Sequence, residues 1–118
     1  MENVNKDILD DLESFSTTEK KKLLLEIRKK VDEIDKDILR LLEKRAFHSR
    51  EIGNVKSSLD LPLYSSAREK EIFENLLKSL ASSLPKKSLI RIYERILDES
   101  RAIQREEIAK KIIADAKD

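Results

Sequence analysis

Residues 24–59 read LLEIRKKVDEIDKDILRLLEKRAFHSREIGNVKSSL, and this stretch decides the fold of the chain. Within it, nine apolar and two polar residues follow one another at alternating steps of three and four. This is the spacing of a helix that packs lengthwise against another helix. We call these positions the heptad stripe: Leu24, Ile27, Val31, Ile34, Ile38, Leu41, Arg45, His48, Ile52, Val55 and Leu59.

Two members of the heptad stripe, Arg45 and His48, are not apolar. A guanidinium on the buried side of a helix is costly unless an anion meets it. A histidine in such a place is more often a hydrogen-bonded interior residue than a catalyst, and no Asp or Ser partner for it is identifiable. The stripe therefore predicts a charged pocket inside a helical bundle.

The composition is typical of an all-helical protein. The chain has 118 residues, of which 42% are charged and 39% hydrophobic, with one Gly, two Pro and no Trp. This length suits one domain, and the mixture of apolar and charged residues suits helices. Because the apolar residues recur in helical register, the composition does not indicate disorder.

Several classes of partner and site are disfavoured by the same counts. The formal net charge is +1, whereas a nucleic-acid-binding protein usually has a clear basic excess. The chain has no Cys and one His, which excludes thiolate metal sites and disfavours histidine sites. It shows no signal peptide and no apolar run of the roughly 20 residues that cross a bilayer. We therefore expect a soluble, cytoplasmic protein that binds neither nucleic acid nor membrane.

The pattern predicts three helices. The first starts at a capping box, Ser16 to Glu19, and runs to about residue 59, before Pro62. A second capping box, Ser66 to Glu69, opens the next helix, and Pro85 suits the first position of the third. We expect a domain over 17–107, an extension over 1–16 (a short helix or a tail), and a helix extension or tail over 108–118.

The first helix is too long to be covered by its own chain. About 43 residues at about 1.5 Å each span roughly 64 Å. A compact domain of this size has a radius of gyration of about 13–14 Å. A second subunit must cover part of the heptad stripe, so the sequence predicts an intertwined, symmetric homodimer.

Three bases on the first helix are candidate anion ligands. Arg45 and Lys56 are eleven residues apart, which places them on one side of a helix about three turns from each other. Arg28 is about 25 Å from Arg45 and about 100° round the axis, so it reaches only a partner's pocket, in an antiparallel dimer. The competing interpretation is a solvated helix face, with long side chains extending into water.

Polar residues on the later helices are further candidates. A capping box by itself explains Glu69, whereas an Arg at a helix N-terminus, as Arg68 would be, opposes the helix dipole and needs another reason. Ser100 and Gln104 share one face of the third helix that is otherwise apolar. A glutamine there needs partners for its amide, either from another helix or from a ligand.

Together these residues resemble the all-helical chorismate mutases, the AroQ class. The resemblance runs from about Leu25 to Gln104, and the ordered set of short stretches is more specific than any one of them. The stretches are Ile27-Arg28-Lys29-Lys30-Val31-Asp32-Glu33-Ile34-Asp35, Leu41-Leu42-Glu43-Lys44-Arg45, Ile52-Gly53-Asn54-Val55-Lys56, Pro62-Leu63-Tyr64 leading into Arg68-Glu69, and Asp98-Glu99-Ser100 with Gln104.

The resemblance implies an intertwined dimer of three-helix subunits that rearranges chorismate, a dianion, to prephenate without a cofactor or metal. By similarity, Arg45 and the partner subunit's Arg28 hold the two carboxylates. Lys56 contacts a carboxylate and the ether oxygen, and Gln104 donates to the same ether oxygen. Glu69 accepts from the ring hydroxyl, while Ser65, Arg68 and Ser100 complete the polar wall.

One position departs from the family pattern. Ser65 stands where the family commonly has Asp, so a hydrogen-bonding group is kept but a charge is lost. Three alternatives remain open on the sequence. They are an isochorismate-pyruvate lyase on the same scaffold, a non-catalytic helical interaction module in which Arg45 pairs with a Glu across the dimer, and a weakly active regulatory domain.

Overall fold

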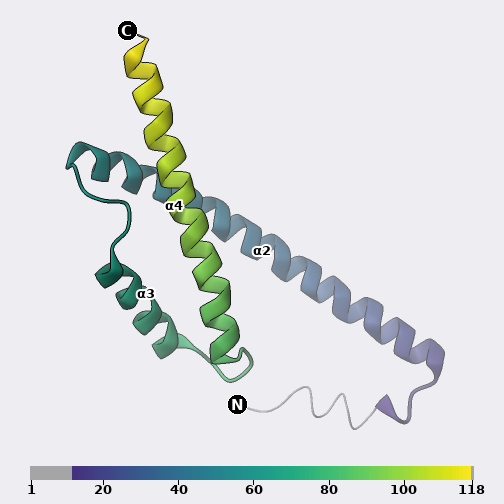
Figure 1. Ribbon diagram of the computed structural model, residues 1–118. Coiled ribbons are helices and arrows are strands. Elements are labelled where there is room, and N and C mark those ends of the chain that lie inside the picture. Colours follow the sequence, from purple (N-terminus) through teal and green to yellow (C-terminus); the bar gives the residue numbers. More distant parts are fainter. Residues whose placement is uncertain (1–11, 118) are drawn as a thin grey trace. The chain divides into compact units, whose positions relative to one another are not determined.

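The computed structural model describes residues 12–117. These residues form three α-helices and no strand: α2 (Thr17–Ser58), α3 (Ser66–Ser79) and α4 (Lys86–Ala116) (Figure 1). The prediction of an all-α fold with one very long first helix is confirmed. Residues 1–11, for which the sequence leaves open a short helix or a tail, lie outside the described residues.

Contacts divide the chain into two units, Met1–Leu42 and Glu43–Asp118, and the boundary falls inside α2. The second unit contains the last part of α2 and the whole of α3 and α4. In this unit α4 crosses the end of α2, and α3 packs against α4 (Figure 1).

The N-terminus of α2 carries the capping box that the sequence predicts. The backbone N–H of Glu19 donates to Ser16 Oγ at 3.1 Å, and the backbone N–H of Ser16 donates to Glu19 Oε1 at 3.3 Å. Each side chain thereby satisfies a backbone donor that the helix itself leaves free. The start of α2 is thus set by local sequence.

The C-terminus of α2 is closed by backbone hydrogen bonds before Pro62 is reached. The N–H of Leu61 donates to the carbonyl of Lys56 at 2.8 Å, and the N–H of Asp60 donates to the carbonyl of Ser57 at 3.2 Å. This is the Schellman pattern, which needs a left-handed residue just after the helix. Asp60 takes that conformation with φ of 53°, although glycine is the usual residue there.

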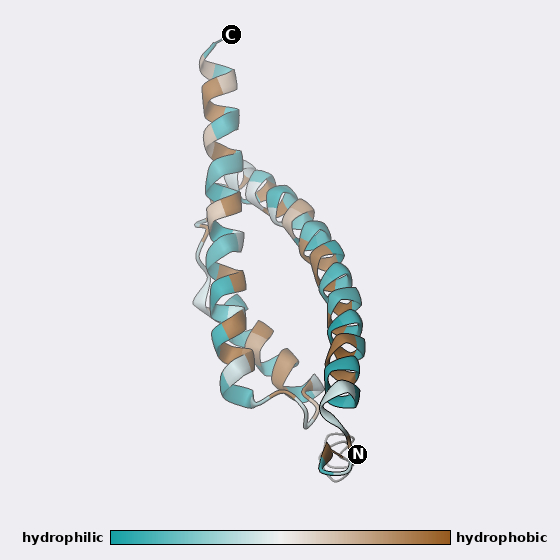
Figure 2. Ribbon diagram, turned by 90° about the vertical axis from the view of Figure 1, so that its right-hand side faces the viewer, coloured by the Kyte–Doolittle hydropathy of each residue, from teal (hydrophilic) through white to brown (hydrophobic). Residues whose placement is uncertain are grey.

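The core of the second unit lies between α3 and α4. Leu89 and Leu97 of α4 are buried, and Ile72, Phe73, Leu76 and Leu77 of α3 are half-buried. Figure 2 shows apolar residues alternating with polar ones along α2 and α4.

None of the helices within residues 12–117 has an apolar stretch long enough to span a membrane. Helix α4 starts at Lys86 with Pro85 as its N-cap, one residue later than predicted.

Helix α4 approaches α2 closely at Gly53. A Cβ atom at this position would lie 3.2 Å from both Cα and Cβ of Gln104, which is closer than ordinary van der Waals contact. Ser49, one turn earlier on the same face, is 4% exposed. Small residues on this face of α2 therefore let the two backbones come together, and Gly53 does more than weaken the helix.

The apolar members of the heptad stripe other than Ile27 are exposed within the described chain. Val31, Ile34, Ile38 and Leu41 are each about half exposed, and Ile52, Val55 and Leu59 are equally open. Such a row of exposed apolar residues is unusual for a monomeric surface. The face of α2 that packs inside the chain is instead the one that carries Ser49 and Gly53.

Replacing Gly53 tests the close approach. Gly53→Leu should lower the free energy of unfolding by about 2 kcal/mol, because the side chain has no space beside Gln104. Lys44→Leu, at an exposed position of the same helix, is the control and should change it little. Urea unfolding followed by circular dichroism, at one fixed protein concentration, provides the measurement. Equal stability of Gly53→Leu and the parent protein would contradict the predicted crowding.

Replacing Asp60 tests the end of α2. Asp60→Gly should raise the free energy of unfolding by about 0.5 kcal/mol, since glycine adopts positive φ without a Cβ clash. Asp60→Val should lower it by about 1 kcal/mol for the opposite reason. The ranking of the three melting temperatures checks this, and a valine variant as stable as the parent would show that the left-handed turn is absent.

Candidate functional site

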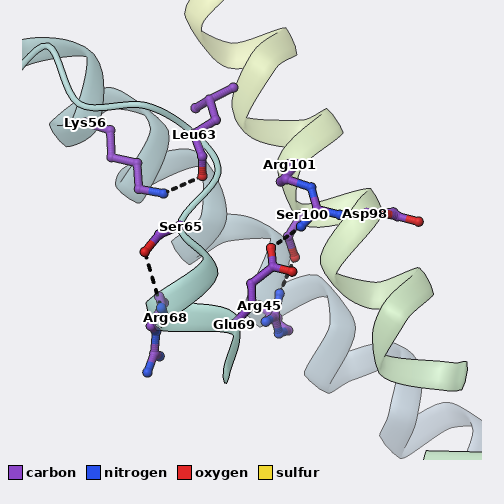
Figure 3. Close-up of polar contacts among 9 residues, drawn as sticks. All are labelled: Arg45, Lys56, Leu63, Ser65, Arg68, Glu69, Asp98, Ser100 and Arg101. Atoms are coloured by element: carbon purple, nitrogen blue, oxygen red, sulfur yellow. Dashed lines mark hydrogen bonds and ion pairs between the residues drawn. The ribbon is translucent and has the colours of Figure 1, made fainter. Parts of the chain in front are cut away.

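All predicted site residues except Arg28 lie in the second unit. The last part of α2 carries Arg45 and Lys56, the start of α3 carries the group around Ser65, and the middle of α4 carries the rest. Figure 3 shows six of these side chains in one region of the structure. The predicted residues of the second unit are Arg45, Lys56, Ser65, Arg68, Glu69, Ser100 and Gln104.

Arg45 joins α2 to α4. Its Nη1 donates a hydrogen bond to Oγ of Ser100, which is buried (Figure 3). Arg45 itself is half-buried. A guanidinium has five N–H donors in a fixed plane, so the serine uses only a small part of its capacity. The arrangement orients the group while leaving donors for an anion.

Lys56 is held by the turn that follows α2. Its Nζ donates to the carbonyl oxygen of Leu63 at 2.8 Å, while its own carbonyl accepts from Leu61 in the helix-terminating turn. Residues 59–63 therefore fix both the backbone of Lys56 and its side chain, and Figure 3 shows the side-chain contact with Leu63. An ammonium has three donors, so Nζ retains donors for a second acceptor.

Gln104 is a buried amide at the close contact with Gly53. The residue is 7% exposed, and its Oε1 has no hydrogen-bond partner among residues 12–117. A buried amide oxygen without a partner costs about 1–3 kcal/mol of stability. Such a group is unfavourable for folding alone, and it leaves an acceptor unpaired, whereas donation to a ligand would come from the amide Nε2. Next to it, Asn54 Nδ2 donates to Glu107 Oε1 at 3.5 Å.

The predicted position of the second capping box, Ser66 to Glu69, is wrong by one residue. The N-cap of α3 is Ser65, whose Oγ accepts from the backbone N–H of Arg68 at 3.2 Å. Ser66 is the first helical residue, and Glu69 makes no capping bond with its side chain. The Arg68 side chain is exposed and pairs with Glu71 one turn away.

The side chain of Glu69 pairs with Arg101, which is not one of the predicted site residues. Arg101 Nη1 donates to Glu69 Oε2, and Arg101 Nη2 donates to Asp98 Oδ1 (Figure 3). The guanidinium also lies over the ring of Tyr64, with its carbon 5.6 Å from the ring centroid. The hydrogen bond from Arg101 to Glu69 is the main cause of a raised pKa of Arg101, and burial acts in the opposite sense.

A signal for Arg101 was present in the sequence. Leu97, Arg101 and Gln104 follow one another at steps of four and three, and both neighbours in that row are buried. A cation between two buried residues of one helix face is the same kind of signal that identified Arg45. The predicted face of the third helix was defined by Ser100 and Gln104, so Arg101 was overlooked.

Two other residues discussed from the sequence lie apart from these contacts. Arg28 belongs to the first unit, is exposed, and has no hydrogen bond or ion pair within residues 12–117. His48 is exposed, with Nδ1 2.5 Å from Glu51 Oε1 and its ring against Phe47. In the same described residues, no group of three or more His, Asp or Glu side chains is arranged to hold a metal ion.

Comparison with known proteins relates this geometry to one family. The family model described as chorismate mutase type II matches residues 27–105. A chorismate mutase from Methanocaldococcus jannaschii is 31% identical over 84 residues, covering 70% of this chain and 85% of the relative. A bifunctional chorismate mutase/prephenate dehydratase from Aquifex aeolicus is 41% identical over 78 residues, which is 63% of this chain but 22% of that protein.

A solved structure agrees with the sequence relatives. The chorismate mutase (form II) from Thermus thermophilus superimposes with a TM-score of 0.67 and 29% identity, covering 70% of this chain and 93% of that one. The matched residues include every predicted site residue of the second unit, and Arg28 as well. The resemblance read from the sequence is therefore confirmed, and the chain belongs to the chorismate mutase type II family.

Proposed function

We propose that this chain is a chorismate mutase, an isomerase that rearranges chorismate to prephenate. The observation that carries the proposal is the pair of half-buried cations, Arg45 and Lys56, inside the region that matches the family. Each is fixed by one contact within the chain and retains free donors. A dianionic substrate with two carboxylates is suited to such a pair.

The proposed reaction needs positioning and electrostatic stabilisation. It is unimolecular, so holding the flexible substrate in its compact reactive shape lowers the barrier. Negative charge grows on the ether oxygen as the bond opens, and fixed donors facing that oxygen stabilise the transition state. Lys56 and Gln104 are the donors that we assign to it. Their supports, the Leu63 carbonyl and the contact with Gly53, are in place before substrate binds.

The remaining residues form the polar surroundings of the substrate in this proposal. Arg45 binds a carboxylate, and Ser100 orients Arg45 through its hydroxyl. Glu69 accepts from the ring hydroxyl. Ser65 accepts from the backbone of Arg68 and keeps its own O–H free to donate, which compensates in part for the missing Asp.

We also propose that the active form is a homodimer in which the second copy covers the heptad stripe. The exposed apolar residues of α2 support this, because they extend over both units and have no cover within the described chain. Arg28 of the partner subunit would then bind the second carboxylate of the substrate. Its exposure and lack of partners among residues 12–117 of its own chain agree with this role. The cytoplasmic location expected from the sequence stays a prediction.

Alanine variants test the two cations. Arg45→Ala and Lys56→Ala should each lower kcat/KM for chorismate at least about 100-fold, since each removes a donor from developing or fixed negative charge. Arg50→Ala and Lys44→Ala, at exposed positions of the same helix, are the matched controls. Loss of chorismate and the identity of the product are measured together. Active Arg45→Ala and Lys56→Ala variants would refute the site. A parent protein that releases salicylate and pyruvate from isochorismate but forms no prephenate from chorismate would refute the mutase.

Mixing two inactive variants tests the shared site. In a hybrid of Arg28→Ala and Arg45→Ala subunits, one of the two sites keeps both arginines. An equal mixture that exchanges freely should therefore recover about a quarter of the parent activity. Native mass spectrometry verifies the hybrids, and the unmixed variants are the controls. Verified hybrids without recovered activity would show that Arg28 does not act across the dimer.

A further inference from the structure

We propose that Arg101 is a positioning residue that holds the Glu69 carboxylate ready to accept from the ring hydroxyl of the substrate. The inference rests on the proposed function, because it assumes that Glu69 faces the substrate. It goes beyond that function by assigning a role to a residue outside the predicted site. Its support is a set of contacts that converge on one guanidinium (Figure 3).

Arg101 connects three separate segments of the second unit. It donates to Glu69 in the first turn of α3 and to Asp98 in its own helix, and it lies over Tyr64 in the loop before α3. These contacts use both nitrogen ends of the guanidinium as well as its flat face. A single side chain thereby fixes the entry to α3 against α4.

The burial of the pair separates it from the surface ion pairs of the chain. The side chains of Arg101 and Glu69 are 20% and 24% exposed, whereas those of Arg68 and Glu71 are 62% and 60% exposed. Exposed pairs are weakened by solvent screening and by the entropy of long side chains. The Arg101–Glu69 pair is less exposed to solvent screening, and the additional contacts of Arg101 with Asp98 and Tyr64 restrict its orientation.

The two oxygens of Glu69 are used differently. Oε2 accepts from Arg101, while Oε1 accepts no hydrogen bond within the described residues. Because Glu69 is the fourth residue of α3 and Ser65 provides the cap, the carboxylate is also free of capping. One oxygen is therefore anchored, and the other keeps its lone pairs for a hydroxyl donor. This division is what a positioned acceptor requires.

The neighbouring contacts supply matched variants. Arg101→Gln removes the positive charge and the planar guanidinium with its two donor ends. Arg101→Lys keeps the charge but has no planar fork to serve Glu69 and Asp98 together. Asp98→Asn weakens the other end of the network and leaves the Glu69 contact in place. Arg95→Gln removes an exposed pair with Glu99 on the same helix and is the control for a general loss of surface charge.

The decisive test is a double-mutant cycle on chorismate turnover. Arg101→Gln should lower kcat about 10-fold or more, with a much smaller change in KM, and Arg101→Lys should recover part of the loss. In a Glu69→Gln background, Arg101→Gln should lower kcat less than about two-fold further, because its effect passes through Glu69. Arg95→Gln should leave kcat unchanged. Circular dichroism and melting temperature are recorded for each variant, and Arg101→Lys replaces Arg101→Gln in the cycle if the latter loses helicity.

The outcomes separate this inference from the proposed function. If the parent protein converts chorismate and the Arg101 and Glu69 losses multiply independently, the positioning role is wrong and the function stands. A kcat that does not change in Arg101→Gln or Arg101→Lys overturns the role in the same way. If the parent protein does not convert chorismate at all, the proposed function fails first, and the role of Arg101 toward the ring hydroxyl fails with it.

Discussion

The close approach of α2 and α4 at Gly53 is the constraint on which the second unit depends. A Cβ at this position would be 3.2 Å from the backbone of Gln104, so the distance between the helices is set by the absence of a side chain. That distance brings Arg45 within reach of Ser100 and Asn54 within reach of Glu107 on the same pair of helices. The contact between α2 and α4 is thus built from small and polar residues, and the apolar packing of this unit lies between α3 and α4.

This division explains which parts of the fold could be predicted from sequence. Helix positions follow from local signals, and the capping box at Ser16 and the break before Pro62 were both predicted correctly in place. The heptad stripe does not pack within the described chain, and its cover by a second subunit stays a prediction. Close helix packing depends on small residues such as Ser49 and Gly53. These residues are not strongly apolar, so a pattern of apolar periodicity does not reveal them.

The burial of a polar residue was predicted correctly at three positions that interrupt an apolar row, whereas His48, which also interrupts one, is exposed. Arg45, Ser100 and Gln104 were found in this way, and all three are buried or half-buried. Arg101 was missed because the predicted face of the third helix was defined by Ser100 and Gln104 and did not include it. Ser65 and Ser66 are both good capping residues, and local sequence does not decide between them. That one-residue difference changes the interpretation of Glu69 from a capping carboxylate to a partner of Arg101.

The polar groups of the second unit are each held by the protein through part of their hydrogen-bonding capacity, and the rest of that capacity is unused within the described chain. Arg45 gives one N–H to Ser100, Lys56 gives one to Leu63, and Glu69 accepts at one oxygen only. A protein selected for stability alone would satisfy or replace such groups, because a buried polar atom without a partner is costly. In this unit, Gln104 Oε1 carries that cost at the close contact with Gly53. Groups that are rigidly held and only partly satisfied are the arrangement that electrostatic catalysis requires, since their orientation is set during folding and their free capacity meets the substrate.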